Sequence, residues 1–356
     1  MPGPVSVHSF IPPYLLHRMI DHGSQRQRSC ASQTLSHVRN LLHNPGPPGH
    51  LPQPSAVAER GEPRQLRRSV HDAQNRELLP GQVVRVEGQG ATGDAAVDEA
   101  YDALGATHGF FLDAFERDSI DNRGFALVGT VHYGEGYQNA FWNGSQMVFG
   151  DGDGELFNRF TRALDVVAHE LAHGVTESEA GLIYANQSGA LNESLSDVFG
   201  VLTQQYVRQQ PADQADWLIG ADLLTERVQG VALRSMAAPG TAYDDPVLGK
   251  DPQPGHMRDF VQTRDDNGGV HINSGIPNRA FYLAALAIGG FAWERAGRIW
   301  YDTLCDRRLS NVAEFDEFAA LTIAHAQRRF SGEPGVGRAV EEAWRQVGVN
   351  VKEIPA

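Results

Sequence analysis

The stretch that decides the fold is VVAHELAHGVTESEAGLIYANQSGALNESLSD, residues 166–197. It places His169 and His173 four residues apart, with Glu170 directly after the first histidine. Residues four apart on a helix project from one face, so the two imidazoles can hold one ion. Glu170 is rotated by about 100° and misses the ion, but it can hold a water bound to that ion. This His-Glu-x-x-His arrangement is typical of zinc hydrolases.

A catalytic zinc keeps three protein ligands and one open position, so a third ligand has to come from elsewhere. Glu193 lies on a second helical pattern, LNESLSD, and a helical hairpin with GLIYANQSG as its turn would bring it alongside the histidines. Asp197 is one turn further on the same face, where it can accept the second N–H of His169 and orient that ring. We therefore predict one Zn²⁺ held by His169, His173 and Glu193. The alternative is a pair of exposed histidines on an amphipathic helix, which would not need the two carboxylates.

Composition limits the other classes of function. The formal net charge of −14 argues against non-specific binding of nucleic acid. Cys30 and Cys305, the two cysteines, cannot build a disulfide framework or a Cys-rich zinc site. No apolar run approaches the roughly 20 residues that a membrane span needs. The N-terminus lacks the basic start of a Sec signal, and Pro12 and Pro13 interrupt its apolar run. We expect neither nucleic acid nor a membrane as a partner.

The changes in composition and hydrophobic pattern along the chain predict an α+β protein with a separable N-terminal extension. Residues 44–64 are rich in Pro and Gly and indicate a linker. Short strand patterns follow at residues 82–88, 125–134 and 140–150, with a helical pattern over residues 94–115. From Leu164 onward amphipathic helices dominate, each bounded by Gly, Pro, Ser or Asn. We divide the chain into residues 1–65, an α+β lobe of residues 66–185 with the HELAH helix, and a mainly helical lobe of residues 186–356.

Further motifs resemble the thermolysin family of zinc endopeptidases, and in particular its protealysin-like members, which have a short propeptide. The resemblance covers about residues 70–350. Its motifs occur in the family's order: NAFWNGSQMVFGDGDG at 139–154, HELAHGVTESEAGLIY, GALNESLSD, ALRSM at 232–236 and DNGGVHINSGIPNRAF at 266–281. The resemblance implies a two-lobed fold with the zinc site in the cleft between the lobes, and hydrolysis of peptide bonds.

The same resemblance implies roles for individual residues. Glu170 would be the general base, which takes a proton and hands it to the leaving nitrogen. Tyr184 and His271 would donate hydrogen bonds to the oxyanion, and Asp266 would support the imidazole of His271. Zinc would polarise the carbonyl and lower the pKa of its water from about 15.7 to about 7. Taken singly, a tyrosine after an apolar run or a histidine in a loop is more often structural, so the joint pattern carries these assignments.

The substrate would be bound by a second set of residues, again by resemblance. Asn139 and the Ala140 carbonyl would hold the peptide backbone like an extra strand, and Arg234 would bind a substrate carbonyl. The side-chain pocket would be lined by Phe157, Phe160, Val166 and Leu233. Such a pocket implies cleavage before bulky hydrophobic residues, although ordinary core positions remain the alternative for these four.

Two departures from the family pattern concern calcium. Asp165 and Asp216 remain from the carboxylates of the calcium-rich members, but Gln204, Leu218 and Ala221 stand at other matching positions. Calcium takes six to eight oxygen ligands, so we expect this double calcium site to be absent. The DGDGE stretch at 151–155 begins like an EF-hand loop but lacks its later Gly and Glu, and we interpret it as a turn.

The stretch SFIPPYLLHRM, residues 9–19, resembles the short propeptide of the protealysin-like members. We expect Ile11–Leu16 to lie in the active cleft, extended by the Pro-Pro pair, until the linker is cut. His8 is close enough to raise the question of whether it reaches the zinc. The partners implied are therefore peptide or protein substrates and the chain's own propeptide as an intramolecular inhibitor.

Three alternatives stay open from the sequence. A zinc aminopeptidase uses the same helix pair, an inactive thermolysin-like relative would act as a protein-binding module, and a cell-surface or host-directed factor would carry protease activity incidentally. The compartment is also open, because family members are commonly secreted whereas no Sec signal is visible.

Overall fold

The computed structural model describes residues 8–43 and 65–351. The chain divides into two compact units. The first runs to Gly174 and includes the short segments Asp222–Gln229 and Asp245–Gly249. The second contains the rest, and the division falls inside one helix, α4 (Leu164–Glu179). In the described parts of the chain, no helix combines the length and the apolar character that crossing a membrane requires.

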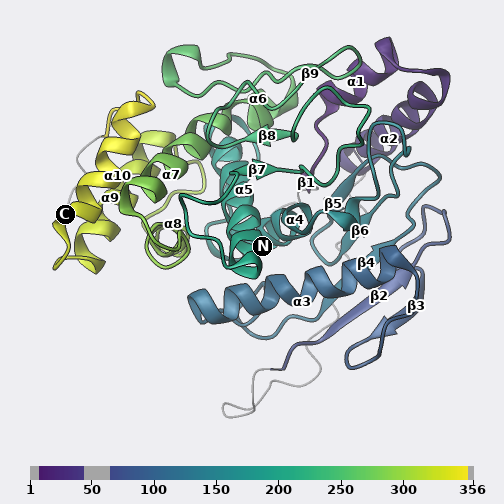
Figure 1. Ribbon diagram of the computed structural model, residues 1–356, viewed down its shortest axis with the longest axis horizontal. Coiled ribbons are helices and arrows are strands. Elements are labelled where there is room, and N and C mark those ends of the chain that lie inside the picture. Colours follow the sequence, from purple (N-terminus) through teal and green to yellow (C-terminus); the bar gives the residue numbers. More distant parts are fainter. Residues whose placement is uncertain (1–7, 44–64, 352–356) are drawn as a thin grey trace. The chain divides into compact units, whose positions relative to one another are not determined.

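A six-stranded mixed sheet forms the framework of the first unit (Figure 1). Its order is β1-β5-β6-β4-β2-β3, in which β4 lies parallel to both β2 and β6 and the remaining pairs are antiparallel. The strands are β1 (His8–Ser9), β2 (Arg68–Asp72), β3 (Gln82–Val86), β4 (Leu127–Val131), β5 (Ala140–Trp142) and β6 (Met147–Phe149). The three predicted strand patterns correspond to β3, β4 and the pair β5 and β6, which divides the single predicted run of residues 140–150. Strands β1 and β2 were missed because neither shows a clear alternation of apolar and polar residues.

Helix α3 (Ala95–Phe115) packs against β2 and β4 and confirms the predicted helical pattern. It starts at an N-cap aspartate, Asp94, whose carboxylate accepts hydrogen bonds from the backbone N–H groups of residues 96 and 97. The same carboxylate contacts Nε2 of His132 at 3.1 Å, and Nδ1 of His132 contacts Asp151 at 2.9 Å. Hydrogen bonding to Asp151, followed by Asp94, raises the pKa of His132 to about 9 against the opposing effect of burial. A charged histidine thus ties the end of β4 to the start of α3.

The N-terminal segment belongs to the first unit and contains β1, α1 (Pro13–His22) and α2 (Gln25–His43). Pro12 is extended, with φ −69° and ψ 152°, but the helix begins at the very next residue. The expectation of an extended backbone over Ile11–Leu16 is therefore wrong beyond Pro12. Proline fits the first turn of a helix because its missing N–H would have no partner there. Leu15, Leu16 and Met19 are buried by the resulting helix.

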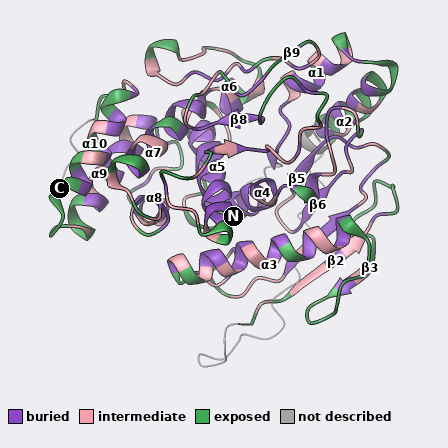
Figure 2. Ribbon diagram, viewed as in Figure 1, coloured by how far each residue is buried: buried purple, intermediate pink, exposed green. Residues whose placement is uncertain are grey.

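Helices dominate the second unit, as the sequence predicted. They are α5 (Asn186–Arg208), α6 (Asp266–Asn273), α7 (Gly275–Ile288), α8 (Ala296–Leu304), α9 (Phe315–Arg329) and α10 (Pro334–Gln346). Helix α5 is buried without interruption from Ser188 to Gln205, as its purple colour in Figure 2 shows. It contacts α6, α7, α8 and α9, so it is the central helix of this unit. A helix buried on all sides holds the carboxylates on it in fixed positions.

Short two-stranded ladders complete the structure. They are β7 (Leu218–Ile219) with β8 (Arg234–Ser235), and β9 (Asp244–Asp245) with β10 (Gly249–Lys250). Two 3₁₀ turns, Phe160–Arg162 and Met257–Asp259, lie in the connections. The DGDGE stretch forms the turn that the sequence predicted. In it Asp153 Oδ1 accepts backbone hydrogen bonds from residues 155, 156 and 157.

Candidate active site

Helix α4 brings His169 and His173 together on one face, as their spacing predicts. Both are fully buried, and their Nε2 atoms are 3.1 Å apart. Two ligands about 2.05 Å from one tetrahedral ion are roughly 3.3 Å apart, so this pair already has the spacing that zinc requires. Gly174 lets the helix approach β5 closely, because a Cβ at that position would lie 3.2 Å from the Trp142 ring.

The described residues contain one group of three side chains that could hold a metal ion, namely His169, His173 and Glu193. All three are buried, and their potential ligand atoms lie within 4.8 Å of one another. Two imidazole nitrogens and one carboxylate oxygen form a donor set that zinc commonly takes. The residues present therefore fit a metal ion of this type.

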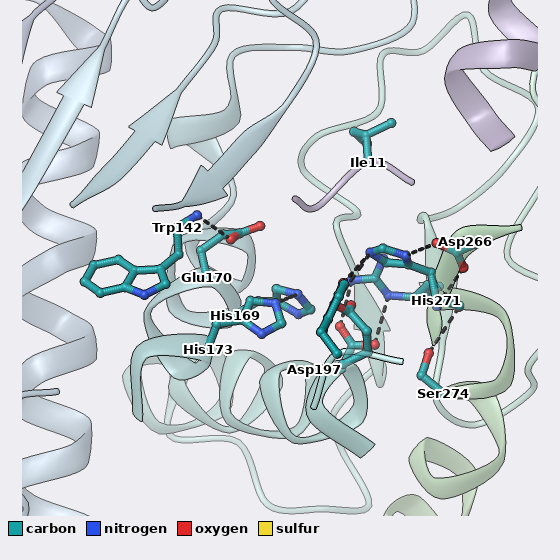
Figure 3. A network of polar contacts seen from close by, with 12 residues as sticks. Ile11, Trp142, His169, Glu170, His173, Asp197, Asp266, His271 and Ser274 are labelled. Atoms are coloured by element: carbon teal, nitrogen blue, oxygen red, sulfur yellow. Dashed lines mark hydrogen bonds and ion pairs between the residues drawn. The ribbon is translucent and has the colours of Figure 1, made fainter. Parts of the chain in front are cut away.

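Glu170 is also fully buried, and its carboxylate extends toward the backbone of Trp142 (Figure 3). Its Oε2 accepts a hydrogen bond of 3.0 Å from the backbone N–H of Trp142 in β5. A hydrogen bond donated to a carboxylate favours the charged form, which is the form that can accept a proton. The sheet thus holds Glu170 in one orientation beside the histidine pair.

The backbone before His271 turns through a left-handed path that aims Asp266 at this histidine. Four consecutive residues, Asp266–Gly269, have φ between +52° and +88°. A Cβ on Gly268 would lie 2.3 Å from the Asn186 side chain, so the first of the two glycines also allows a close approach. Oδ1 of Asp266 lies 2.6 Å from Nδ1 of His271, and its Oδ2 accepts the backbone N–H of His271 at 2.9 Å.

His271 is surrounded by groups that favour its protonated form. Burial lowers the pKa of His271, but the charges of Asp266 and Glu193 outweigh it and raise the pKa to about 9. Its Nε2 lies 3.2 Å from the hydroxyl of Tyr184 and 3.5 Å from Glu193 Oε1. The Tyr184 hydroxyl also donates a short hydrogen bond to Glu193. Three residues with predicted roles, Tyr184, Glu193 and His271, are therefore in mutual contact.

Asp197 lies in a buried ion pair with Arg234. Nε and Nη2 of Arg234 donate to the two carboxylate oxygens at 2.9 and 2.7 Å, and the two side chains are 5% and 0% exposed. Asn278 Nδ2 donates to the same carboxylate at 2.8 Å. Sequence reasoning assigned no role to Asn278, although it lies within the quoted motif at 266–281. Its signal was an asparagine directly after Pro277, at the start of a mostly apolar helical pattern.

The residues predicted to hold a substrate backbone hold the N-terminal segment instead. Asn139 Oδ1 accepts the N–H of Ile11 at 2.8 Å, and its Nδ2 donates to the Ile11 carbonyl at 3.0 Å. The Ala140 carbonyl accepts the N–H of Phe10 at 3.0 Å. Strand β1 continues this ladder, with His8 opposite Trp142 and Ser9 opposite Phe141. The segment thus adds an antiparallel strand to β5.

Side chains of the same segment cover the histidine pair. The ring of His8 stacks on His173 with centroids 4.3 Å apart and planes 12° apart. The ring of Phe10 meets His169 edge-on at 5.1 Å. His8 and Phe10 are both buried. The question that the sequence raised about His8 therefore has a partial answer: it contacts one of the candidate ligands directly.

Helix α2 fastens this segment to the rest of the first unit. His37 Nε2 lies 2.8 Å from the Tyr133 hydroxyl, and its Nδ1 lies 3.2 Å from the Tyr137 hydroxyl. Thr34 Oγ1 accepts the backbone N–H of Gln138 at 3.0 Å. Two of the partners, Tyr137 and Gln138, directly precede Asn139, so α2 is attached next to the residue that binds Ile11.

The four residues predicted to line a side-chain pocket, Phe157, Phe160, Val166 and Leu233, are all buried. Phe157 and Phe160 are in ring contact at 6.1 Å. Burial is equally compatible with a pocket wall and with an ordinary core position, so the pocket stays a prediction.

Three family profiles match this chain in sequence. They are "Protealysin propeptide" over residues 8–49, "Thermolysin metallopeptidase, catalytic domain" over residues 63–177, and "Thermolysin metallopeptidase, alpha-helical domain" over residues 180–349. Together they cover the N-terminal segment and both histidine- and glutamate-bearing helices.

Individual relatives extend this similarity to nearly the whole chain. An "Extracellular metalloprotease" of Pectobacterium carotovorum subsp. carotovorum is 60% identical over 347 residues, covering 97% of each chain. "Protease PrtS" of Photorhabdus sp. (strain Az29) is 48% identical, covering 96% of this chain and 92% of that protein. Among solved structures, "Precursor of Protealysin, Metalloproteinase from Serratia proteamaculans" is 59% identical with a TM-score of 0.88. That alignment covers 96% of this chain and all of the solved one.

Proposed function

Because this chain belongs to the thermolysin family of metallopeptidases and carries a protealysin-type propeptide, we propose that it is a zinc endopeptidase whose propeptide lies where the substrate backbone binds. The observation that carries this proposal is the pairing of Phe10 and Ile11 with Asn139 and Ala140. An inhibitor that adds a strand to β5 uses the same backbone groups that an extended substrate would use.

We propose His169, His173 and Glu193 as the metal ligands. Their burial and the short distances between their potential ligand atoms support this assignment. Asp197, held by Arg234 and Asn278, is proposed to orient His169 from behind. Bound zinc supplies Lewis acidity, which polarises the scissile carbonyl and acidifies water. A calcium requirement is not expected, since Leu218 and Ala221 offer no oxygen side chains where calcium-rich members have carboxylates.

The proton transfers are assigned to Glu170. Its Oε2 accepts a hydrogen bond from the Trp142 N–H, which fixes the carboxylate beside the ligand pair. We propose that Glu170 accepts the proton of the attacking water and then passes it to the leaving nitrogen. The sheet contact makes the base rigid, so little reorganisation is needed during the reaction.

Charge that develops on the carbonyl oxygen would be met by His271 and Tyr184. The Asp266 carboxylate accepts Nδ1–H of His271, so an Nε2–H donor requires the protonated ring, which the raised pKa of about 9 favours. The Tyr184 hydroxyl lies beside that nitrogen, which places two donors close together. Donors oriented in advance in this way typically contribute about 10²–10³ in rate each.

Substrate recognition is proposed to combine backbone and side-chain contacts. Asn139 and Ala140 would pair with the peptide main chain, and Arg234, held by Asp197, would bind a substrate carbonyl. An apolar pocket that includes Phe157 and Leu233 would favour cleavage before bulky hydrophobic residues.

We propose the division of the chain at residues 65 and 185, with release of the propeptide by a cut in the linker of residues 44–64. Two relatives are named extracellular, and we propose export for this chain as well.

The test is intact mass and activity of purified full-length protein over time, with and without a zinc chelator. We expect a chelator-sensitive loss of the N-terminal segment, together with a rise in cleavage of an acetyl-blocked peptide. A blocked peptide separates an endopeptidase from an aminopeptidase, which needs a free amine.

The matched control is Glu170→Gln, which keeps the size of the side chain and removes the base. This variant should bind zinc normally and stay unprocessed and inactive. Hydrolysis at the parent rate by Glu170→Gln, or absence of tightly bound zinc from active protein, would contradict the proposed mechanism.

A further inference from the structure

A basic pocket lies in the second unit, at the C-terminal end of α8 and along α9. Its volume is about 490 Å³. Its lining residues are Asp302, Cys305, Asp306, Arg307, Arg308, His325, Arg328 and Arg329. None of them has a role in the proposed peptide hydrolysis.

The charge of this pocket is opposite to that of the whole chain. Four guanidinium groups line it against two carboxylates, whereas the complete chain carries a net charge of −14. A local surplus of positive charge on an acidic protein attracts anions to one place.

The two carboxylates are occupied in holding two of the arginines. Nε and Nη2 of Arg308 lie 3.1 and 2.7 Å from the Asp306 carboxylate oxygens. Arg329 binds Asp302 through Nε and Nη2 in the same way. Arg298 also donates to Asp302, at 3.0 Å. These ion pairs hold Arg308 and Arg329 in position. Each guanidinium has five N–H donors, so further donors can bind another acceptor.

His325 binds a third arginine, Arg328. The neighbours of His325 also determine which of its ring nitrogens carries the proton. Nη2 of Arg328 lies 2.7 Å from His325 Nδ1, and an arginine can only donate. Nδ1 must therefore accept, so the proton is on Nε2, which donates to Asp306 at 2.8 Å. The imidazole is buried, and its contact with Arg328 supplies no carboxylate to balance the arginine's charge.

Two guanidinium charges consequently have no carboxylate partner. Over residues 8–43 and 65–351, Arg307 and Arg328 make no ion pair, and both are exposed at the pocket. Adjacent guanidinium groups without counter-charges are favoured when a multivalent anion lies between them, because its oxygens accept several charge-assisted hydrogen bonds.

We propose that the basic pocket binds a phosphate group, either the free ion or a monoester of a small molecule. Phosphate offers several acceptor oxygens and about two negative charges at neutral pH, which matches the forked donors of Arg307 and Arg328 and the surplus charge. The volume exceeds that of one phosphate ion, so a small organic substituent can be accommodated as well.

Isothermal titration of the zinc-loaded full-length protein tests this assignment. The probes are inorganic phosphate and glycerol phosphate, with chloride at equal ionic strength as the reference. We expect saturable binding of one phosphate group per chain, and an upward shift of the melting temperature with phosphate but not with chloride. Tighter binding of the monoester identifies a carried phosphate as the ligand, and tighter binding of inorganic phosphate identifies the free ion.

The decisive variant is the double substitution Arg307→Gln with Arg328→Gln, and the matched control is Arg258→Gln. Arg258 is an exposed arginine of the same unit that does not line the pocket. The double variant should bind phosphate about 10-fold more weakly or worse, with the control unchanged. Equal affinity of the double variant and the parent would place phosphate elsewhere, for instance on the zinc, and overturn the proposal. Absence of saturable binding to the parent at concentrations on the order of 10 mM would overturn it too.

Discussion

Phe10 offers the sharpest test of how the propeptide is held. Its side chain is fully buried and its ring meets His169 edge-on at 5.1 Å. Truncating a buried phenylalanine to alanine costs about 3 kcal/mol or more. The backbone bonds from Phe10 and Ile11 to β5 do not depend on this ring, so they remain in Phe10→Ala. The substitution should therefore weaken docking of the segment without changing its register.

A loss of about 3 kcal/mol corresponds to roughly a 100-fold rise in the undocked population of the precursor. We expect the initial rate of blocked-peptide cleavage by uncut Phe10→Ala precursor to rise by up to that factor. The assay follows fluorescence of a quenched peptide while intact mass is measured on the same samples, and rates are extrapolated to zero processing.

Phe115→Ala is the matched control, since Phe115 is a buried ring of α3 in contact with Phe110 and Phe111. It removes the same atoms without touching the added strand, so it should lower stability but leave the inhibition of uncut protein intact. If Phe10→Ala precursor is as inactive as the parent, or if Phe115→Ala activates equally, the ring of Phe10 does not hold the propeptide in the way described.

Three further predictions follow from the site and its surroundings. Glu193→Ala should lose most of its zinc on dialysis, as measured by elemental analysis, and retention of one ion per chain would remove Glu193 from the ligand set. His271→Ala should keep its zinc and its KM while kcat falls by about 10²–10³, and an unchanged kcat in steady-state kinetics would exclude the oxyanion role. The raised pKa of His132 means that its ion pairs with Asp151 and Asp94 stabilise the fold fully below pH about 6.5 and cease to do so as pH rises through about 9. Melting temperatures from pH 6 to 10 should show this loss in the parent and not in His132→Gln, and parallel curves would refute it.

The sequence was most informative where chemistry and periodicity coincide. The spacing of His169 and His173 predicted their shared face, and the amphipathic patterns predicted α5 and the helices from α7 to α10, but not the short helix α6. The strand patterns at β3, β4, β5 and β6 were also recognisable, because β-branched and aromatic residues concentrate there. In each case local composition and the final fold agree.

What remained hidden depends on contacts between distant residues. Strand β1 contains only His8 and Ser9, and it exists because β5 supplies the partner strand. Asn278 shares the Asp197 carboxylate with Arg234 across 81 residues of sequence, which no local pattern reveals. The helix that begins at Pro13 was misjudged because a Pro-Pro pair favours an extended backbone unless the second proline opens a helix.

The position of β1 also indicates which backbone conformation a protein substrate must have in order to be cleaved. Once the first strand has left, the border of the sheet at β5 exposes amide and carbonyl groups that only an unpaired stretch of main chain can satisfy. In a helix, the backbone amide and carbonyl groups already form hydrogen bonds within the helix. In a central strand of another sheet, they already form hydrogen bonds with the neighbouring strands. Folded target proteins would therefore be cleaved in loops or in segments that unfold locally. The rate of their digestion would depend on how often such segments open, more than on their amino-acid composition.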